Sequence, residues 1–327
     1  MKFTIITLIL VLSFLKTEVQ SFSEEHYQYD KVYKTMLGYY NRGLYHKAVE
    51  YPDSLIGNKY VNGSTNYFIA RVYALANEFD NTLFYLEKAV KKGITKKQIG
   101  RMYDLDAFRE SNMNIIYELN YDKWHQEYEN GKNDFELDSV YIKEIQKIQD
   151  EYSKNLTIRR ADGDEIIEVK DSLRFYHTTK RLDSLSFSVM IELMLEKGFP
   201  TYKTVGKSFY TYTRYLRYNM PDDYDVNCAD WKKIKAMIFA EIEKGTIYPF
   251  YYAAIEDYIR LKKKNPQLYG TMNYIHKSSI DYSNGVEFEN PEELNIRRRT
   301  VGLCSIQLEM WSKARELPLS LKEINFK

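Results

Sequence analysis

Apolar residues recur three or four positions apart along most of this chain, the spacing that places side chains on one face of an α-helix. The pattern predicts a mainly α-helical protein. In the second half it predicts helices that begin at Asp138, that run from Asp171 to Gly198, and that cover 204–218, 227–244 and 250–264. A further helix is expected to begin at Asn290-Pro291, because proline is well accommodated in a first helical turn.

In the first half the pattern also repeats every 34 residues, so that Tyr39 matches Tyr73 and Tyr45 matches Phe79. This period is typical of tetratricopeptide repeats, in which one pair of helices forms one repeat. Small residues are needed where the two helices touch, and large ones fill the gaps between turns. The second copy has this size pattern at Ala70, Tyr73, Phe79, Thr82, Leu86 and Ala89. The alternative is a set of ordinary helical hairpins with a chance period.

The first copy is weaker, because Pro52 stands where the second copy has a large residue. Two repeats are fewer than a free-standing solenoid needs, so the repeat part should pack against residues later in the chain. A further helical seam is predicted for that purpose at Leu105, Phe108, Ile115, Ile116 and Leu119.

Two short β-hairpins are predicted in the second half. The first covers Leu156 to Val169 around the turn dipeptide Asp162-Gly163. The second has strands near 271–276 and 285–289, with its turn at Asn284-Gly285. The expected fold is therefore tetratricopeptide-like helical hairpins followed by an α-helical domain with one or two small β-hairpins.

The N-terminus has the pattern of a secretory signal peptide. Lys2 precedes an apolar stretch from Phe3 to Leu15, and Val19 and Ser21 are small residues at the spacing of a cleavage site. An uncleaved N-terminal anchor is the alternative. The domains expected are a signal peptide (1–21), a repeat domain (22–130) and a helical domain (131–327). The pattern predicts an exported protein, periplasmic or secreted, without a stable membrane span after cleavage.

Composition excludes some classes of function. The 47 basic and 46 acidic residues nearly balance, so no basic face for nucleic acid is expected. Cys228 and Cys304 are the only cysteines, too few for a thiolate metal cluster. In an oxidising compartment they either pair or remain as two free thiols. The 31 tyrosines suit helix seams and peptide- or sugar-binding grooves alike.

The sequence contains no recognisable catalytic set. There is no Gly-x-Ser-x-Gly elbow and no His-Glu-x-x-His zinc pair, and the five histidines are scattered singly. Val205-Gly206-Lys207-Ser208 resembles the end of a phosphate-binding loop, but Thr201 stands where that loop requires glycine. We therefore predict no cofactor, no metal ligands and no catalytic residues.

Residues 183–311 resemble an uncharacterised bacterial family known as domain of unknown function 6624. Three blocks carry the resemblance, and together they cover about two-fifths of the chain: Lys197-Gly198-Phe199-Pro200-Thr201 with Val205-Gly206; Asp257 with Pro266-Gln267-Leu268-Tyr269-Gly270-Thr271; and Asn290-Pro291-Glu292 with Arg297-Arg298 and Val301-Gly302-Leu303. Tetratricopeptide-like segments precede this domain in similar proteins. No activity is established for the family, so the resemblance implies a fold and candidate positions.

The chain departs from the family pattern at three positions. Asn219 replaces a histidine, Met272 replaces a glutamine, and Tyr258 replaces an arginine. The loss of the histidine removes the one group suited to act as a base near neutral pH. The candidate residues for a ligand site or a structural motif are Asp257, Gln267, Tyr269, Gly270, Thr271, Arg297 and Arg298.

Three functions remain open at this point. The first is a non-catalytic envelope protein that presents its helical-repeat surface to a protein or glycan partner. The second is a hydrolase-like enzyme with Asp257 as acid or base, Gln267 and Tyr269 orienting substrate, and Arg297 or Arg298 holding an anion. In the structural alternative for these residues, Tyr269-Gly270 forms a turn and the arginines pin the last helices. The third function is an assembly scaffold.

Overall fold

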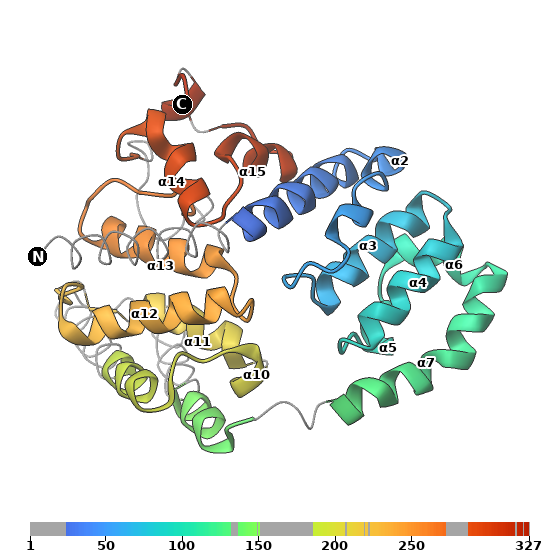
Figure 1. Cartoon of the computed structure of the whole chain (residues 1–327), viewed down its shortest axis with the longest axis horizontal. Helices are drawn as coiled ribbons and strands as arrows, with labels where there is room; N and C mark the ends of the chain where they lie inside the picture. Colours follow the sequence, from blue (N-terminus) through green and yellow to red (C-terminus); the bar gives the residue numbers. More distant parts are fainter. Residues whose placement is uncertain are drawn as a thin grey trace, which may run out of the picture. The chain divides into compact units, whose positions relative to one another are not determined.

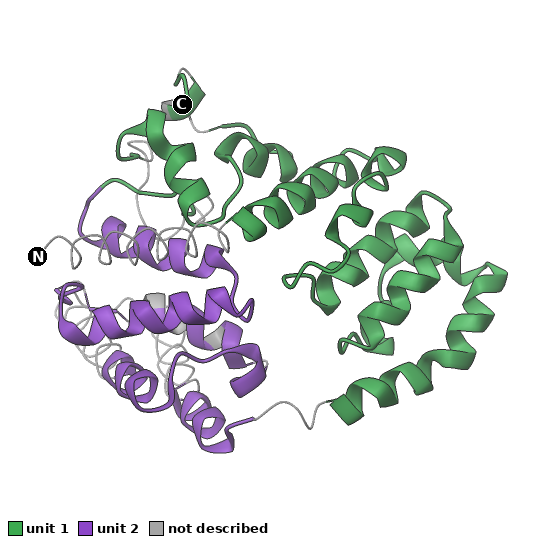
Figure 2. Ribbon diagram, in the orientation of Figure 1, with its two compact units in different colours: residues 1–134, 266–327 green, residues 135–265 purple. Residues whose placement is uncertain are grey.

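The computed structural model describes residues 24–131, 137–148, 150, 186–272 apart from 207, 219 and 222, and 287–326 apart from 318 and 323. These residues are mainly helical, which confirms the predicted mainly α-helical character, and no β-strand occurs among them (Figure 1). The chain divides into two compact units. Unit 1 comprises residues 1–134 and 266–327, and unit 2 comprises residues 135–265 (Figure 2). The sequence predicts domains that follow one another along the chain. Unit 1 instead combines residues from before and after unit 2.

The N-terminal part of unit 1 is a series of helices. It starts with a helix over residues 24–40, the blue helix before α2 in Figure 1. The remaining helices are, in chain order, α2 (Tyr45–Ala48), the 3-10 helix η1 (Pro52–Leu55), α3 (Gly63–Leu75), α4 (Phe79–Val90), α5 (Lys96–Ile99), η2 (Tyr103–Leu105), α6 (Asp106–Arg109) and α7 (Asn112–Gly131).

Helices α3 and α4 form the hairpin that the second repeat copy predicts. The Asn62 side chain caps α3 by accepting a hydrogen bond from the Thr65 amide. Asn77 turns the chain at φ 61°, and Gly93 ends the second helix at φ 93°. The small residues of the pattern are fully buried, since Ala70, Thr82 and Ala89 are all 0% exposed. The positions fit the repeat, while membership of the tetratricopeptide class stays a prediction.

The first copy is not a regular helix pair. Its second helix is the single turn α2, and Pro52 begins η1 four residues later. Proline has no N–H and a fixed φ, so it ends the helical hydrogen-bond ladder at this point.

The predicted seam after α4 is only half correct. Leu105 and Phe108 are buried at 0% and 1% exposure. Ile115, Ile116 and Leu119 were predicted to be buried but are 60%, 41% and 78% exposed. The face of α7 that is buried carries aromatic residues one turn apart, namely Tyr117, Tyr121 and Trp124. Helix α7 therefore carries one aliphatic face and one aromatic face. The aromatic face, which has the larger side chains, is the buried one.

The C-terminal part of unit 1 begins with a single parallel bridge between Gln267 and Phe288. It continues through η4 (Pro291–Glu293), α14 (Leu294–Thr300), α15 (Ile306–Ser312) and α16 (Leu319–Lys322). Its core contains Phe288, Leu294, Ile306, Met310 and Leu321.

Helix 24–40 packs closely against α15. A Cβ atom built on Gly38 would lie 1.8 Å from a ring carbon of Trp311, so only glycine fits beneath this indole. Arg42 lies 4.3 Å from the centre of the same ring and donates to the Trp311 carbonyl at 2.8 Å. Asn41 donates to the Ser312 carbonyl at 2.7 Å. These contacts join segments about 270 residues apart, since the Arg42 and Asn41 bonds span 269 and 271 residues.

Unit 2 is a group of helices over residues 139–148, residues 186–197, α10 (Tyr202–Val205), α11 (Ser208–Tyr218), α12 (Ala229–Glu243) and α13 (Pro249–Lys262). The predicted helices over 227–244 and 250–264 are confirmed as α12 and α13. The single helix predicted over 204–218 is wrong, because Gly206 at φ 56° interrupts it and separates α10 from α11. Gly198 at φ 84° closes the helix before it, as predicted.

Several predictions lie outside the described residues. They are the signal peptide, the first hairpin, the turn of the second hairpin and Asn219. The described ends of the second hairpin are not strands, because Thr271 and Met272 lie in a turn and Phe288 bridges to Gln267. Within the described part of the chain, no helix combines the length and apolar character needed to cross a membrane.

Candidate functional site

The Arg297 side chain holds two neighbouring segments of unit 1 together. Its Nε donates to the Leu268 carbonyl at 2.9 Å, and its Nη2 donates to the Glu289 carbonyl. Both terminal nitrogens also lie 3.3 Å from the Asn290 carbonyl oxygen. The planar guanidinium suits this task, because it offers five donors in a fixed arrangement.

Arg298 plays a similar role but is almost completely buried, at 2% exposure. Its Nε donates to the Cys304 carbonyl at 2.6 Å and its Nη1 to the Tyr269 carbonyl at 2.7 Å. Its Nη2 lies 3.6 Å from Glu309 Oε2. These contacts are the ones that the structural alternative describes for the arginines.

The segment that the arginines hold is partly buried, since Leu268 and Tyr269 are half-buried and the residues on either side are buried. Gln267 is 0% exposed, and its Oε1 accepts a hydrogen bond from the Met272 amide at 3.0 Å. Gly270 has φ 66°, a conformation that side chains rarely adopt, and Thr271 is buried beside it. The structure therefore brings six of the seven candidate residues into one part of unit 1, where they form a turn and its supports.

Asp257 belongs to helix α13 of unit 2. Its side chain is 0% exposed. A group buried to this extent offers no open surface to a substrate.

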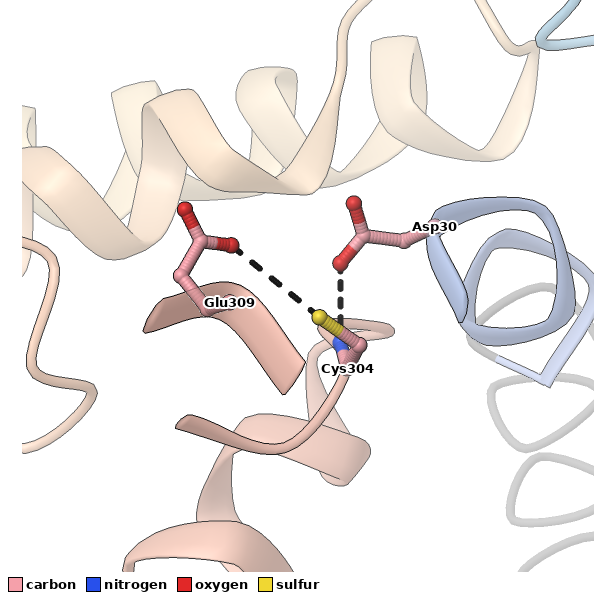
Figure 3. Close-up of side chains that lie close together, drawn as sticks. All are labelled: Asp30, Cys304 and Glu309. Atoms are coloured by element: carbon pink, nitrogen blue, oxygen red, sulfur yellow. Dashed lines mark hydrogen bonds between the residues drawn. The ribbon is translucent and has the colours of Figure 1, made fainter. Parts of the chain in front are cut away.

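A cluster of charged side chains lies where helix 24–40 packs against the C-terminal helices (Figure 3). Glu309 on α15 is its centre, with its carboxylate oxygens 3.1 Å from Lys34 Nζ, 3.6 Å from Arg298 Nη2 and 2.5 Å from Lys313 Nζ. The Cys304 amide donates to Asp30 Oδ2 at 2.8 Å, and the Cys304 thiol lies 4.0 Å from Glu309 Oε2. We call Asp30, Lys34, Arg298, Cys304, Glu309 and Lys313 the charged cluster.

The pKa values in the charged cluster result from burial and pairing. Burial alone would raise the pKa of Glu309, but the charges of Lys34, Arg298 and Lys313 outweigh it and lower that pKa to about 2. Burial opposes the charge of Lys34, yet Asp30 and Glu309 raise its pKa. Burial raises the pKa of Cys304 well above the usual value, so its thiol stays protonated. The cluster is a set of paired charges around a neutral thiol.

Three of these groups also have the spacing of a metal site. One ligand atom from each of Asp30, Cys304 and Glu309 lies within 4.8 Å of the other two. A divalent cation would need the thiolate form of cysteine, which the raised pKa disfavours. It would also meet two buried cations, because Lys34 and Arg298 already face Glu309. The surroundings fit an ion-pair network better than a metal ion.

The two cysteines are both free thiols in the structure, which corresponds to one of the two alternatives left by the sequence. Cys304 is buried, whereas Cys228 is partly exposed and accepts the Trp231 amide at 3.4 Å at the start of α12.

A separate pocket of about 290 Å³ opens on the repeat part of unit 1. It lies between the segment 52–61 and the helices α3 and α4. Its lining combines apolar side chains with two lysines, one tyrosine and two asparagines: Pro52, Leu55, Ile56, Gly57, Asn58, Val61, Asn66, Ile69, Tyr85, Lys88 and Lys92. We call this the α3–α4 pocket.

Sequence reasoning missed both features. Asp30 and Lys34 show only the four-residue spacing of an ordinary surface ion pair, and so do Glu309 and Lys313. Lys88 and Lys92 have the same spacing, which is common on solvated helix faces. Nothing in the sequence distinguishes the charged cluster or the pocket lysines from ordinary surface charges. Comparison with known proteins gives no further guide, because no family model, no curated protein and no solved structure matches this chain.

Proposed function

We propose that the chain is an exported, non-catalytic protein of the bacterial cell envelope that presents its helical-repeat surface to a protein or glycan partner. The observation that carries this proposal is the contrast between two regions. The α3–α4 pocket opens to solvent, with exposed apolar residues Ile56 and Phe84 beside it. The motif residues Gln267 and Arg298 are buried and bonded to backbone groups.

The hydrolase alternative receives no comparable support. Its acid or base would be Asp257, which is 0% exposed. Its anion-binding group would be Arg297, which donates to the Leu268 and Glu289 carbonyls, or Arg298, which already pairs with Glu309. A general acid or base must come within hydrogen-bond reach of the substrate. The buried Asp257 carboxylate offers no such access, so we do not propose catalysis.

The proposal is tested by probing a peptide array and a bacterial glycan array with the purified protein. We expect retention on one array, and we expect Ile56→Glu to weaken it roughly 10-fold, because a charge at this apolar position resists desolvation. Val189→Glu, on a partly exposed residue of unit 2, is the matched control and should bind normally. Absence of retention on both arrays would contradict the proposal, as would equal losses in the two variants.

A further inference from the structure

The lining of the α3–α4 pocket is positively charged. Its lining includes Lys88 and Lys92 and no acidic residue. The lysine between them pairs twice, since Lys91 Nζ lies 2.7 Å from Glu87 and 2.8 Å from Glu127. Within the described part of the chain, Lys88 and Lys92 have no such partner within 4.0 Å. An anion in the pocket would therefore meet two ammonium groups that have no carboxylate partner among the described residues.

Other contacts hold both lysines in place. Lys88 Nζ lies 4.0 Å from the centre of the Phe84 ring, and Lys92 Nζ donates to the Val61 carbonyl at 2.5 Å. Partial burial, and then the neighbouring charge of Lys88, lower the pKa of Lys92. A bound anion would oppose both effects on Lys92. Its negative charge would stabilise the ammonium group against partial burial and would offset the positive charge of Lys88.

Tyr85 adds a hydrogen-bond donor that has no partner. Its side chain is 4% exposed and lines the pocket, and its hydroxyl makes no hydrogen bond within the described residues. Burial first and Asp53 second raise the pKa of Tyr85 to about 12, so the hydroxyl keeps its proton. A buried hydroxyl without a partner destabilises a fold, and a ligand oxygen that accepts its proton would remove that cost.

The rest of the pocket is apolar and small. Leu55 and Ile69 are buried at 2% and 0% exposure and, with Pro52, give it an apolar floor. Its volume of about 290 Å³ lies just below the ~300–1,000 Å³ of typical ligand pockets, which suits a short segment of a partner. Neutral sugars usually stack on a free aromatic face, but Tyr85 already stacks on Tyr73 at 5.5 Å. The lining favours a ligand with an apolar group next to an anion.

We propose that the α3–α4 pocket binds an acidic peptide segment, with an apolar side chain on its floor and an adjacent Asp or Glu carboxylate at Tyr85, Lys88 and Lys92. The inference rests on the proposed function and narrows the partner from protein or glycan to an acidic polypeptide. The Tyr85 hydroxyl donates to the carboxylate, and the two ammonium groups neutralise it.

The test is an octapeptide array with every pair of residue types at its two central positions, probed with the purified protein. We expect the retained pairs to combine a large apolar residue with Asp or Glu, and exchange of that acid for its amide to weaken binding about 10-fold. Lys88→Met and Lys92→Met should each weaken it about 3- to 10-fold. Lys97→Met, on an exposed lysine of α5 with no role in the pocket, should leave it unchanged.

Tyr85→Phe separates a binding role from a structural one. Because the hydroxyl has no partner in the described structure, its removal should leave Tm equal or higher while binding weakens about 5-fold. Retention of neutral or basic pairs, or equal binding by wild type and the Lys88, Lys92 and Tyr85 variants, would overturn the inference. Retention on the glycan array alone would overturn it while the proposed function stands. Absence of retention on the peptide array and on the glycan array would contradict both this inference and the proposed function.

Discussion

Replacement of Glu309 by glutamine is expected to lower the free energy of unfolding by about 3–5 kcal/mol. The Glu309 side chain is 4% exposed and faces Lys34 at 3.1 Å and Arg298 at 3.6 Å. Glutamine has nearly the same shape but no charge, so two cations would remain in the interior without their central partner. An uncompensated buried charge is far more costly than a lost surface pair. Urea unfolding followed by far-UV circular dichroism measures the change.

Glu316→Gln is the matched control for this prediction. Glu316 pairs with Lys322 at 2.6 Å, but its side chain is 84% exposed. Exposed pairs contribute about 0–1 kcal/mol, so this variant should unfold almost like the wild type. If the two substitutions had similar small effects, Glu309 would not be the centre of a buried network.

The charged cluster should also make stability sensitive to acid. The pKa of Glu309 is about 2 in the folded chain, below its usual value of 4.5, so the charged form stabilises the fold. This contribution is fully present above about pH 4.5 and is lost as pH falls through the folded pKa near 2. It amounts to about 3 kcal/mol. Lys34 keeps its charge throughout this range, because Asp30 and Glu309 raise its pKa.

The measurement is the free energy of unfolding of the wild type and of Glu309→Gln as a function of pH. Other groups also titrate in acid, among them His26, whose pKa burial lowers. The difference between the two proteins isolates Glu309, because both contain His26. That difference should be largest above about pH 5 and shrink toward pH 2. A constant difference over this range would contradict the assignment of the lowered pKa to Glu309.

The helical pattern predicted much of the fold because it is a local property. The repeat spacing located α3 and α4, and residues with left-handed conformations, Asn77 and Gly93, follow the two helices. Prediction failed where a local pattern allowed two outcomes. The aliphatic stripe with Leu119 and the aromatic stripe with Tyr117 both have helical spacing on α7, and only tertiary packing selects the buried one.

The structure places six of the seven candidate residues in one part of unit 1, but the sequence could not show their surroundings. From the sequence alone, Arg297 and Arg298 could be anion-binding groups or structural supports. Their carbonyl partners at Leu268 and Tyr269 are 29 residues away, beyond any local pattern. The charged cluster depends on a still longer separation, since 275 residues lie between Lys34 and Glu309. Such contacts are set by the tertiary fold.

The central structural claim is that helix 24–40 and the C-terminal helices of unit 1 form one cooperative structure. Native-state hydrogen exchange read by mass spectrometry tests it most directly, because it gives a free energy of opening for each segment. We predict that residues 24–40 and 303–312 open with the same free energy and that Glu309→Gln lowers both together. Faster exchange of residues 24–40 in the wild type, unchanged by that substitution, would contradict the claim.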